Sequence, residues 1–440
     1  MKTSRRKFLA ATLIPTLSGS IMMRAGKAQT IASSPSAGTD MTDALQSAID
    51  SAANTGHLSL PAGQFATRGL RLPSRFMLSG VPGATELIHL GDDPLLGAED
   101  ESDIVVSGLS LDGSGAGGEL WHRGLVHFSK CENVTIRDCA IANTGLNGIS
   151  LLGTSGRVDN CQISGSAYTG LFIYDGAGVF VSGNTISRCH NGGIRVWRGE
   201  AGADGTIISG NRINAIDWAD GGNGQNGNGI NIFRADEVIV SDNHISDCAF
   251  SAIRLNATNN TQISGNVCVA SGEVAVFSEF SFTGSIISGN IIDGAAAGIS
   301  MTNFNDGGRL AVCTGNIVRN LYARSETNPD LDAPYGIAAE ADAIISDNVV
   351  ENVPGTGITA GWGPFLRDVT INGNLVRDID VGIAVSVAEG AGTATVTGNT
   401  IIGARRQAMV GAAWHETVSN DLAAEAERFP LIVMDGNRSL

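Results

Sequence analysis

Two arginines in a repetitive stretch of the chain, Arg195 and Arg254, are well suited to recognise an acidic sugar. A guanidinium group bonds a carboxylate through two parallel hydrogen bonds, so either arginine can neutralise a uronate carboxylate. A base can then remove the adjacent ring hydrogen and break the glycosidic bond by β-elimination. Tyr174 and His190 are the candidate bases, because both occur in the same stretch.

Acidic residues offer a second chemistry, since two carboxyl groups about 5–9.5 Å apart can hydrolyse a glycosidic bond. Asp217 and Asp220 are the main candidates, with Asp175 and Glu279 as further acids. Asp217 and Asp220 also suit a solvated loop, and His190 suits a polar corner before two glycines. Sequence spacing does not decide between elimination and hydrolysis, so both hypotheses stay open.

Aromatic and amide side chains accompany these groups in a pattern typical of a sugar-binding surface. Aromatic rings stack on the faces of pyranoses, and amides bond to their hydroxyl groups. Aromatic residues are also common on ordinary strands, so sugar binding is a hypothesis rather than a necessity. The candidate substrate-binding residues are Trp197, Trp218, Asn231, Phe233, Asn256 and Phe277.

The elements that must position these residues are copies of one short repeat. A short apolar strand ends at a Gly-Asn or Asp-Asn corner, a second short strand follows, and a Gly-Ile strand completes the repeat. Most corner asparagines are 23 to 32 residues apart, and they are Asn184, Asn211, Asn243, Asn266, Asn290, Asn316, Asn348, Asn374, Asn399 and Asn437. A repeat of that length indicates a solenoid.

Apolar residues alternate with others inside each repeat, as in IRVW (194–197) and INIF (230–233). Alternation predicts strands, and strands this short bury an apolar face only when identical coils stack. We therefore predict an all-β protein with a single parallel β-helix of about twelve or more coils and an N-terminal capping helix over residues 42–49. Glycine supplies the positive φ of each corner, and the corner asparagines form a ladder from coil to coil.

In each Gly-Ile strand, the first and the third residue after Ile are predicted to point outward. They form an outward column whose middle contains Arg195, Trp197, Asn231 and Arg254. Two corners next to this column carry insertions, one between Asn211 and Gly229 and one between residues 316 and 336. Insertions in a solenoid gather on one face, which is often the binding face.

The N-terminus predicts export. Ser4–Leu9 reads SRRKFL, the pattern of a twin-arginine signal, and a cleavage site follows Ala28. Cleavage removes six basic and no acidic residues, so 22 basic and 44 acidic residues remain and the net charge is −22. A surface this acidic argues against nucleic acid as a partner. We expect a periplasmic or secreted protein whose partners are the twin-arginine export machinery and a polysaccharide.

We divide the chain into five parts. They are a signal peptide (1–28), a linker (29–40), a cap with the first irregular coils (41–123), the regular repeats (124–412), and a short helix with a last coil (413–440). No apolar run of the mature chain is long enough to span a membrane. The seven cysteines show no metal-site spacing and favour buried free thiols, with Cys139 and Cys161 at ladder positions. We expect a monomer without a cofactor, and the sequence does not decide whether the protein requires calcium.

The repeats, the helix TDALQSAID (42–50) and LPAG (60–63) resemble right-handed parallel β-helix proteins of the pectate-lyase-like class. The likeness covers essentially the whole mature chain and implies a right-handed fold and a polysaccharide ligand. SRRKFL ahead of such repeats is similar to a family of uncharacterised twin-arginine-translocated repeat proteins. The Asp-Asp pair of polygalacturonases and the Asp-Pro-His motif of mannuronan epimerases are absent, and Arg254-Leu255-Asn256 matches the polygalacturonase Arg-Ile-Lys only in part. The non-catalytic alternative is a carbohydrate-binding or envelope scaffold.

We predict that export depends on the paired arginines. Replacing Arg5 and Arg6 together with lysine should leave the precursor in the cytoplasm, because the export machinery reads the arginine pair as an address. Cell fractionation with an antibody against the chain measures this, and N-terminal sequencing of the exported form should begin at Gln29. Normal export of the double variant would rule out a twin-arginine signal.

Overall fold

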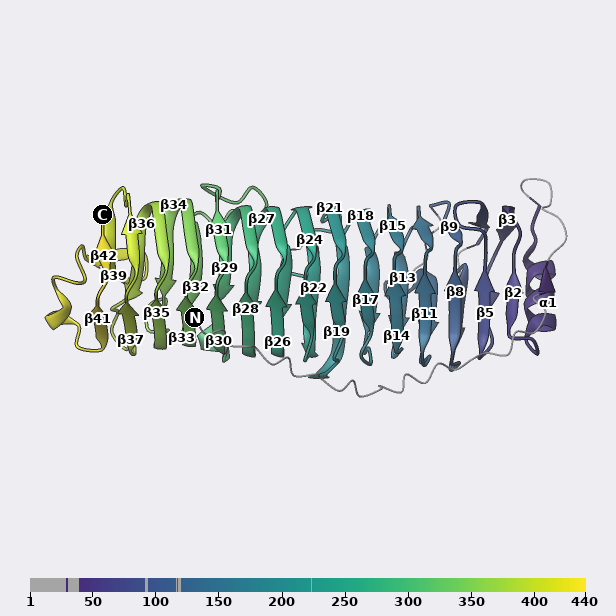
Figure 1. Cartoon of the computed structure of the whole chain (residues 1–440), viewed down its shortest axis with the longest axis horizontal. Coiled ribbons are helices and arrows are strands. Elements are labelled where there is room, and N and C mark those ends of the chain that lie inside the picture. The colour runs from purple at the N-terminus through teal and green to yellow at the C-terminus, as the bar shows by residue number, and fades with distance from the viewer. Residues whose placement is uncertain (1–28, 31–38, 92–93, 116, 118–119, 223) are drawn as a thin grey trace, which may run out of the picture.

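The computed structural model describes residues 29–30, 39–91, 94–115, 117, 120–222 and 224–440. Figure 1 shows the chain as a long stack of coils along one axis, with α1 (Thr42–Ala52) at the N-terminal end. The stack has about 14 coils, and neighbouring coils pair through parallel strands. The prediction of a single parallel β-helix with an N-terminal helix is confirmed. The predicted signal peptide (1–28) lies outside the described residues.

Three strands per coil make three long faces. The first face is a 16-stranded sheet whose strands mostly precede the Gly-Asn corners. Its strands are β1 (Gln29–Thr30), β2 (His57–Ser59), β5 (Phe76–Ser79), β8 (Ile104–Ser107), β11 (Val134–Arg137), β14 (Gly156–Asp159), β17 (Phe180–Ser182), β20 (Ile207–Ser209), β23 (Ile239–Ser241), β26 (Asn259–Ser264), β28 (Thr283–Ser288), β30 (Arg309–Thr314), β33 (Ala341–Ser346), β35 (Arg367–Asn372), β37 (Ala394–Thr397) and β41 (Ile432–Asp435).

The second face consists of the strands that follow the corners. They are β3 (Gly63–Thr67), β6 (Thr85–His89), β9 (Ser110–Asp112), β12 (Ala140–Ala142), β15 (Gln162–Ser164), β18 (Thr185–Cys189), β21 (Arg212–Ile216), β24 (His244–Cys248), β31 (Ile317–Arg319), β38 (Thr400–Ile402) and β42 (Arg438–Ser439). Four longer strands run on from the second face into the third, and they are β27 (Val267–Glu279), β29 (Ile291–Met301), β34 (Val349–Ala360) and β36 (Leu375–Ser386).

The third face, called the Gly-Ile face below, is completed by ten further strands. They are β4 (Leu70–Arg71), β7 (Leu96–Glu99), β10 (Gly124–Ser129), β13 (Asn147–Leu152), β16 (Thr169–Tyr174), β19 (Gly192–Ala203), β22 (Asn228–Asp236), β25 (Ile253–Asn256), β32 (Tyr335–Ala339) and β39 (Gln407–Ala413). The antiparallel strand β40 (Glu416–Ser419) pairs with β39. Isoleucine or leucine of successive strands pair directly, as Leu171 with Ile194 and Ile194 with Ile230, and all three are fully buried.

The corner asparagines form the predicted ladder. Oδ1 of Asn211 accepts hydrogen bonds from the backbone N–H of Asn184 at 3.0 Å and from its Nδ2 at 2.9 Å. Nδ2 of Asn184 also donates to the carbonyl oxygen of Val158 in the preceding coil, at 2.8 Å. The same pattern repeats through to Asn437, and Gly183, before the first of these asparagines, has φ of 65°. Each side chain therefore ties three coils together.

Cysteines continue the ladder toward the N-terminus. Cys161 occupies the corner position one coil before Asn184, and its N–H donates to Asn184 Oδ1 at 2.8 Å. All seven cysteines are free and buried. The predicted buried thiols are therefore confirmed.

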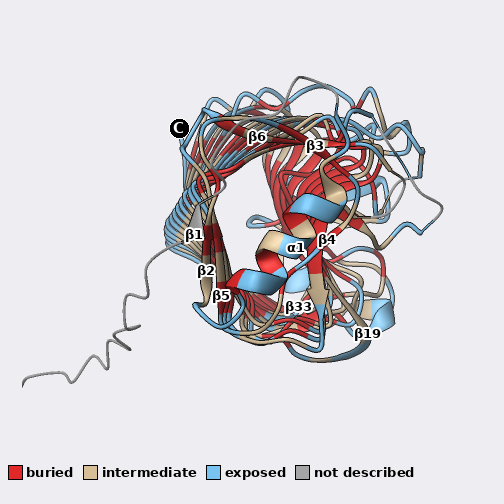
Figure 2. Ribbon diagram, turned by 90° about the vertical axis from the view of Figure 1, so that its right-hand side faces the viewer, coloured by how far each residue is buried: buried red, intermediate tan, exposed pale blue. Residues whose placement is uncertain are grey.

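The two ends of the stack are closed differently. Leu45 and Ile49 of α1 are buried against the first coils, and Figure 2 shows this helix lying across the end of the stack. Met41 is the N-cap residue of α1, and Asp40 Oδ1 accepts the N–H of Thr42. Near the C-terminus, where the sequence predicted a short helix, the chain forms one 3-10 turn, Ala426–Arg428. No helix in the described part of the chain combines the length and apolar character of a membrane span.

We predict that the ladder contributes directly to stability. Asn266→Ala should lower the free energy of unfolding by about 1–3 kcal/mol, because the buried N–H groups of Asn243 lose their acceptor. Asn214→Ala is the matched control, since its amide also bonds the next coil but is exposed to solvent. Urea denaturation measures both, and equal losses would contradict a special role for the ladder.

Candidate functional site

Arg254 lies in a buried ion cluster. Its Nε and Nη2 donate to the two carboxylate oxygens of Glu279 at 2.7 and 2.8 Å, and Nη1 donates to Glu273 at 2.9 Å. All three side chains are buried, and burial raises the pKa of Glu273 despite the nearby guanidinium group. Asn256 donates to Glu279 at 2.9 Å, and Asn328, from the second insertion, donates to Glu273 at 2.8 Å. The guanidinium charge is thus neutralised within the protein.

Arg195 is also covered, but by amides. Its Nη2 donates to the carbonyl oxygen of Asn191 at 2.8 Å and to Oδ1 of Asn226, in the first insertion, at 2.6 Å. Burial lowers its pKa to about 10, although Asp220 opposes the shift. Asp220 itself accepts a hydrogen bond from Nδ2 of Asn191 at 3.0 Å. Asp220 therefore helps to position the cover over Arg195.

The outward column is therefore less exposed than the sequence predicted. Strand register matches the prediction, since Arg195 pairs with Asn231 and Asn231 with Arg254. Only 5% of Arg195 and 7% of Arg254 are nevertheless exposed, because the insertions fold over this part of the Gly-Ile face. The expectation that both guanidinium groups lie open on an outward column is wrong in this structure. Their roles in catalysis remain predictions.

Aromatic rings form a continuous strip beside Arg195. We define the aromatic strip as Trp121, Phe172, Tyr174, Trp197 and Phe233. Neighbouring ring centroids are 5.5 to 6.4 Å apart, and Tyr174 and Trp197 pair across β16 and β19. Trp121 is 48% exposed, Phe172 is buried, and the other three are half-buried. The strip thus presents ring surface to solvent over three adjacent coils.

Trp197 is held in place from two sides. Its indole N–H donates to Oδ1 of Asn231 at 2.6 Å, and the guanidinium carbon of Arg195 lies 5.0 Å from the ring centroid. Asn231 in turn donates to the carbonyl oxygen of Gly224 at 3.2 Å. Trp121 was missed at the sequence level because it precedes the first regular Gly-Ile strand and shares none of the repeat pattern.

Phe277 and Trp218 lie outside the strip. The guanidinium carbon of Arg254 is 5.1 Å from the Phe277 ring centroid, so Phe277 packs on the ion cluster. Trp218 packs edge-on against Phe250 with centroids 5.8 Å apart. Oδ1 of Asp175 accepts the N–H of Gly199 at 3.0 Å. These side chains therefore have structural partners whatever else they contact.

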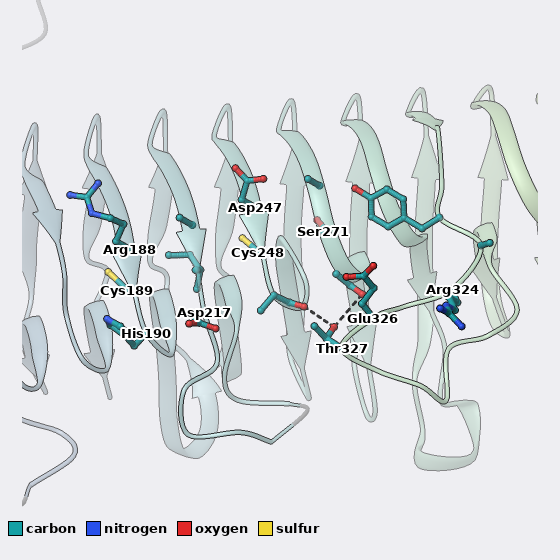
Figure 3. Close-up of a pocket in the computed structure, with 17 residues that line it drawn as sticks. Arg188, Cys189, His190, Asp217, Asp247, Cys248, Ser271, Arg324, Glu326 and Thr327 are labelled. Atoms are coloured by element: carbon teal, nitrogen blue, oxygen red, sulfur yellow. Dashed lines mark hydrogen bonds between the residues drawn. The ribbon is translucent and has the colours of Figure 1, made fainter.

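His190 and Asp217 meet in a different place, a pocket of about 1010 Å³ between the second face and the second insertion. Figure 3 shows both side chains at one end of the pocket and Arg324 and Glu326 at the other. Thr327 donates to the carbonyl oxygen of Ala249 at 2.8 Å and so anchors the insertion over the earlier coils. The structure therefore separates His190 and Asp217 from the aromatic strip, although sequence analysis grouped them with it.

Comparison with known proteins identifies the fold. Residues 123–217 match the family model described as a right handed beta helix region. The hand of the predicted β-helix is thereby confirmed. No curated protein matches the chain. In the part of the chain that the structure describes, no group of three or more His, Cys, Asp or Glu side chains is placed to hold a metal ion.

Several solved structures are similar over most of the chain. PfbA, a surface adhesin of Streptococcus pneumoniae, is 14% identical with a TM-score of 0.50, and the match covers 87% of this chain and 91% of PfbA. Gene product 12 of bacteriophage phi29 is 16% identical with a TM-score of 0.50, over 81% of this chain and 50% of that one. The A-module of the Azotobacter vinelandii mannuronan C-5 epimerase AlgE6 is 15% identical with a TM-score of 0.44, over 91% and 96%. At this identity the likeness shows the fold alone.

We predict that the ion cluster is structural. Arg254→Ala should lower the free energy of unfolding by about 3–5 kcal/mol, because Glu273 and Glu279 would remain buried without a counter-charge. Arg319→Ala is the control, since Arg319 also bonds a carboxylate of a neighbouring coil, Asp293, but in an exposed pair worth less than about 1 kcal/mol. Urea denaturation of both variants tests this. A similar small loss in each would contradict the role of the cluster.

Proposed function

We propose that the protein binds a polysaccharide along the aromatic strip of the Gly-Ile face. The observation that carries this proposal is the run of partly exposed rings on three adjacent strands. Coils repeat about every 4.8 Å along the axis, so the strip offers a regular series of stacking positions to a linear chain of sugars. Singly scattered exposed aromatics would need no such explanation, whereas a contiguous exposed set marks a binding surface.

The strip is organised before any ligand binds. The hydrogen bond from the Trp197 indole to Asn231 and the Arg195 guanidinium beside the ring fix the orientation of the indole. A ring that is already ordered loses little conformational entropy when a sugar stacks on it, which favours binding. Tyr174, which is half-buried, adds a hydroxyl group to the ring surface, and that group can bond a sugar hydroxyl.

Binding has more support than β-elimination. Elimination of a uronate needs a guanidinium group that can reach the sugar carboxylate, yet Arg254 is paired with two glutamates and Arg195 is covered by Asn226. His190 lines the separate pocket that also contains Arg188 and Arg324, apart from the aromatic strip. If Arg195 or Arg254 is to bind the sugar carboxylate, the insertion that covers it must move, whereas binding uses rings that are already partly exposed.

The proposal includes the place where binding occurs. The twin-arginine pattern of residues 4–9 would carry the folded chain across the cytoplasmic membrane, to the periplasm or the medium. Polysaccharides of the envelope or the surroundings are the ligands available there. The likeness to twin-arginine-translocated repeat proteins belongs to the same proposal. A non-catalytic scaffold on such a polymer would use the same strip.

We predict that removing one ring weakens polysaccharide binding. Trp197→Ala should reduce affinity about tenfold, equivalent to ~1.4 kcal/mol, because one stacking position is lost. Affinity electrophoresis in native gels that contain glucan, mannan, xylan, galactan or a polyuronate measures the retardation of the protein. Phe180→Ala is the control, since Phe180 is an exposed ring on the first face.

Wild-type protein should be retarded in at least one of these gels, Phe180→Ala equally, and Trp197→Ala markedly less. Absence of retardation in all gels would contradict polysaccharide binding. Equal retardation of the Trp197 variant would place binding away from the strip.

A further inference from the structure

A second cavity, of about 680 Å³, lies on the same Gly-Ile face toward the C-terminal end. Strands β32, β34, β36 and β39 and the end of the second insertion line it. Strands β22, β25, β27, β29 and β32 are successive neighbours, so about 20 Å separates the end of the aromatic strip from this cavity. A polysaccharide lying along the face would therefore reach both.

Glu340, which follows β32, is the buried acid of this cavity. It is 8% exposed, and its Oε2 accepts the backbone N–H of Phe304 at 2.6 Å. Among the described residues it forms no ion pair, and Arg309 and Arg367, from the strands on either side of β33, pair with Asp342. Burial raises the pKa of Glu340 to about 6, since the charged carboxylate is poorly solvated there. The group therefore holds a proton in mildly acidic solution.

Two exposed indoles line the same cavity. Trp362 and Trp414 are 37% and 49% exposed, and their ring centroids are 5.7 Å apart. His415 packs edge-on against Trp362 with centroids 4.5 Å apart. Ring faces beside an uncharged carboxyl group are the lining that a sugar residue needs, because they contact the pyranose while the acid reaches its glycosidic oxygen.

The charges that line the cavity select among sugars. Four carboxyl groups face a single guanidinium group there, namely Asp330, Asp332, Glu340 and Asp380 against Arg406. Asp380 also pairs with Arg405 at 2.7 Å, which leaves the two aspartates of the second insertion as the exposed acids. A uronate would be repelled by these groups, whereas an uncharged sugar would not.

We propose that this cavity hydrolyses a glycosidic bond of an uncharged glycan, with Glu340 as the proton donor and Asp330 or Asp332 as the base. This rests on the proposal that the face binds polysaccharide. Glu340 gives its proton to the glycosidic oxygen as the bond from that oxygen to the anomeric carbon breaks. Water adds to the anomeric carbon and passes a proton to the aspartate, and that proton returns to Glu340 through solvent. One water is consumed, and each product ends in a hydroxyl group.

The test is release of reducing ends from glucan, mannan, xylan, galactan and a polyuronate by the purified full chain. Wild-type protein should act on an uncharged polymer and not on the polyuronate, with a rate that falls as pH rises past about 6, because the acid must be protonated. Glu340→Gln should lower kcat at least about a hundredfold with retardation in affinity gels unchanged. Glu351→Gln is the matched control, a half-buried glutamate that pairs with Arg377, and should behave as wild type.

Substrates with different leaving groups distinguish a catalytic role of Glu340 from a merely structural one. On 4-nitrophenyl oligosaccharides of the cleaved polymer, whose leaving group needs no protonation, Glu340→Gln should lose less than about tenfold and show no decline above pH 6. Either Asp330→Asn or Asp332→Asn should remove activity on both substrates. Equal losses of Glu340→Gln on both substrates would overturn the assignment of the acid.

Failure of hydrolysis and failure of binding are distinguishable. Wild-type protein that is retarded in a gel but releases no reducing ends from any polymer would overturn the hydrolase and leave the binding proposal standing. Protein that is neither retarded nor active would overturn both. Activity on the polyuronate alone would overturn the assignment of an uncharged substrate.

Discussion

The asparagine ladder is the constraint on which the rest of the structure depends. From Asn211 to Asn437, each corner amide accepts two N–H groups from the preceding coil's asparagine and donates to a carbonyl oxygen further back, so the polar corner of each of these coils is satisfied. Such corners would otherwise leave backbone groups without partners at the most crowded bend of the chain. Because the ladder fixes the register of neighbouring coils, it also aligns the Gly-Ile strands. The aromatic strip exists only because that alignment brings residues of separate repeats side by side.

The regular stacking of the coils explains why most of the fold could be predicted from the sequence. Corner residues and Gly-Ile strands are local patterns, and a solenoid needs only contacts between adjacent repeats. Pairs such as Tyr174 with Trp197 therefore followed from counting residues along the repeats, and the structure has them in register. The capping helix likewise followed from a local amphipathic pattern.

The candidate site could be predicted only in part, because insertions break the repeat. Asn226 from the first insertion contacts Arg195, and Asn328 from the second contacts the ion cluster of Arg254. The sequence of an insertion does not indicate how far the insertion folds back over the neighbouring coils. Thr327, for example, bonds Ala249, which is 78 residues earlier. Glu273 completes the ion cluster from within a long strand that carries no repeat signature. Because both arginines are buried, they act as structural groups in this structure rather than as open anion-binding groups.

The two ends of the Gly-Ile face are lined by different kinds of side chain, because the insertions that cover them differ. Near the aromatic strip the insertions supply amides and satisfy the cations, whereas toward the C-terminus the lining has indoles and an acid without a counter-charge. Carboxyl groups dominate the second region, in keeping with the overall negative charge of the chain. An uncharged polymer that contacts rings at both ends of the face therefore fits this lining best.

Binding along the Gly-Ile face can be tested with a crystal structure of the protein bound to a hexasaccharide of an uncharged polymer that retards it in gels. We expect sugar rings stacked on Trp121 and Trp197, with the chain running along the Gly-Ile face toward Trp362 and Trp414. Sugar bound instead in the pocket of His190 and Asp217, or on the first face, would contradict it.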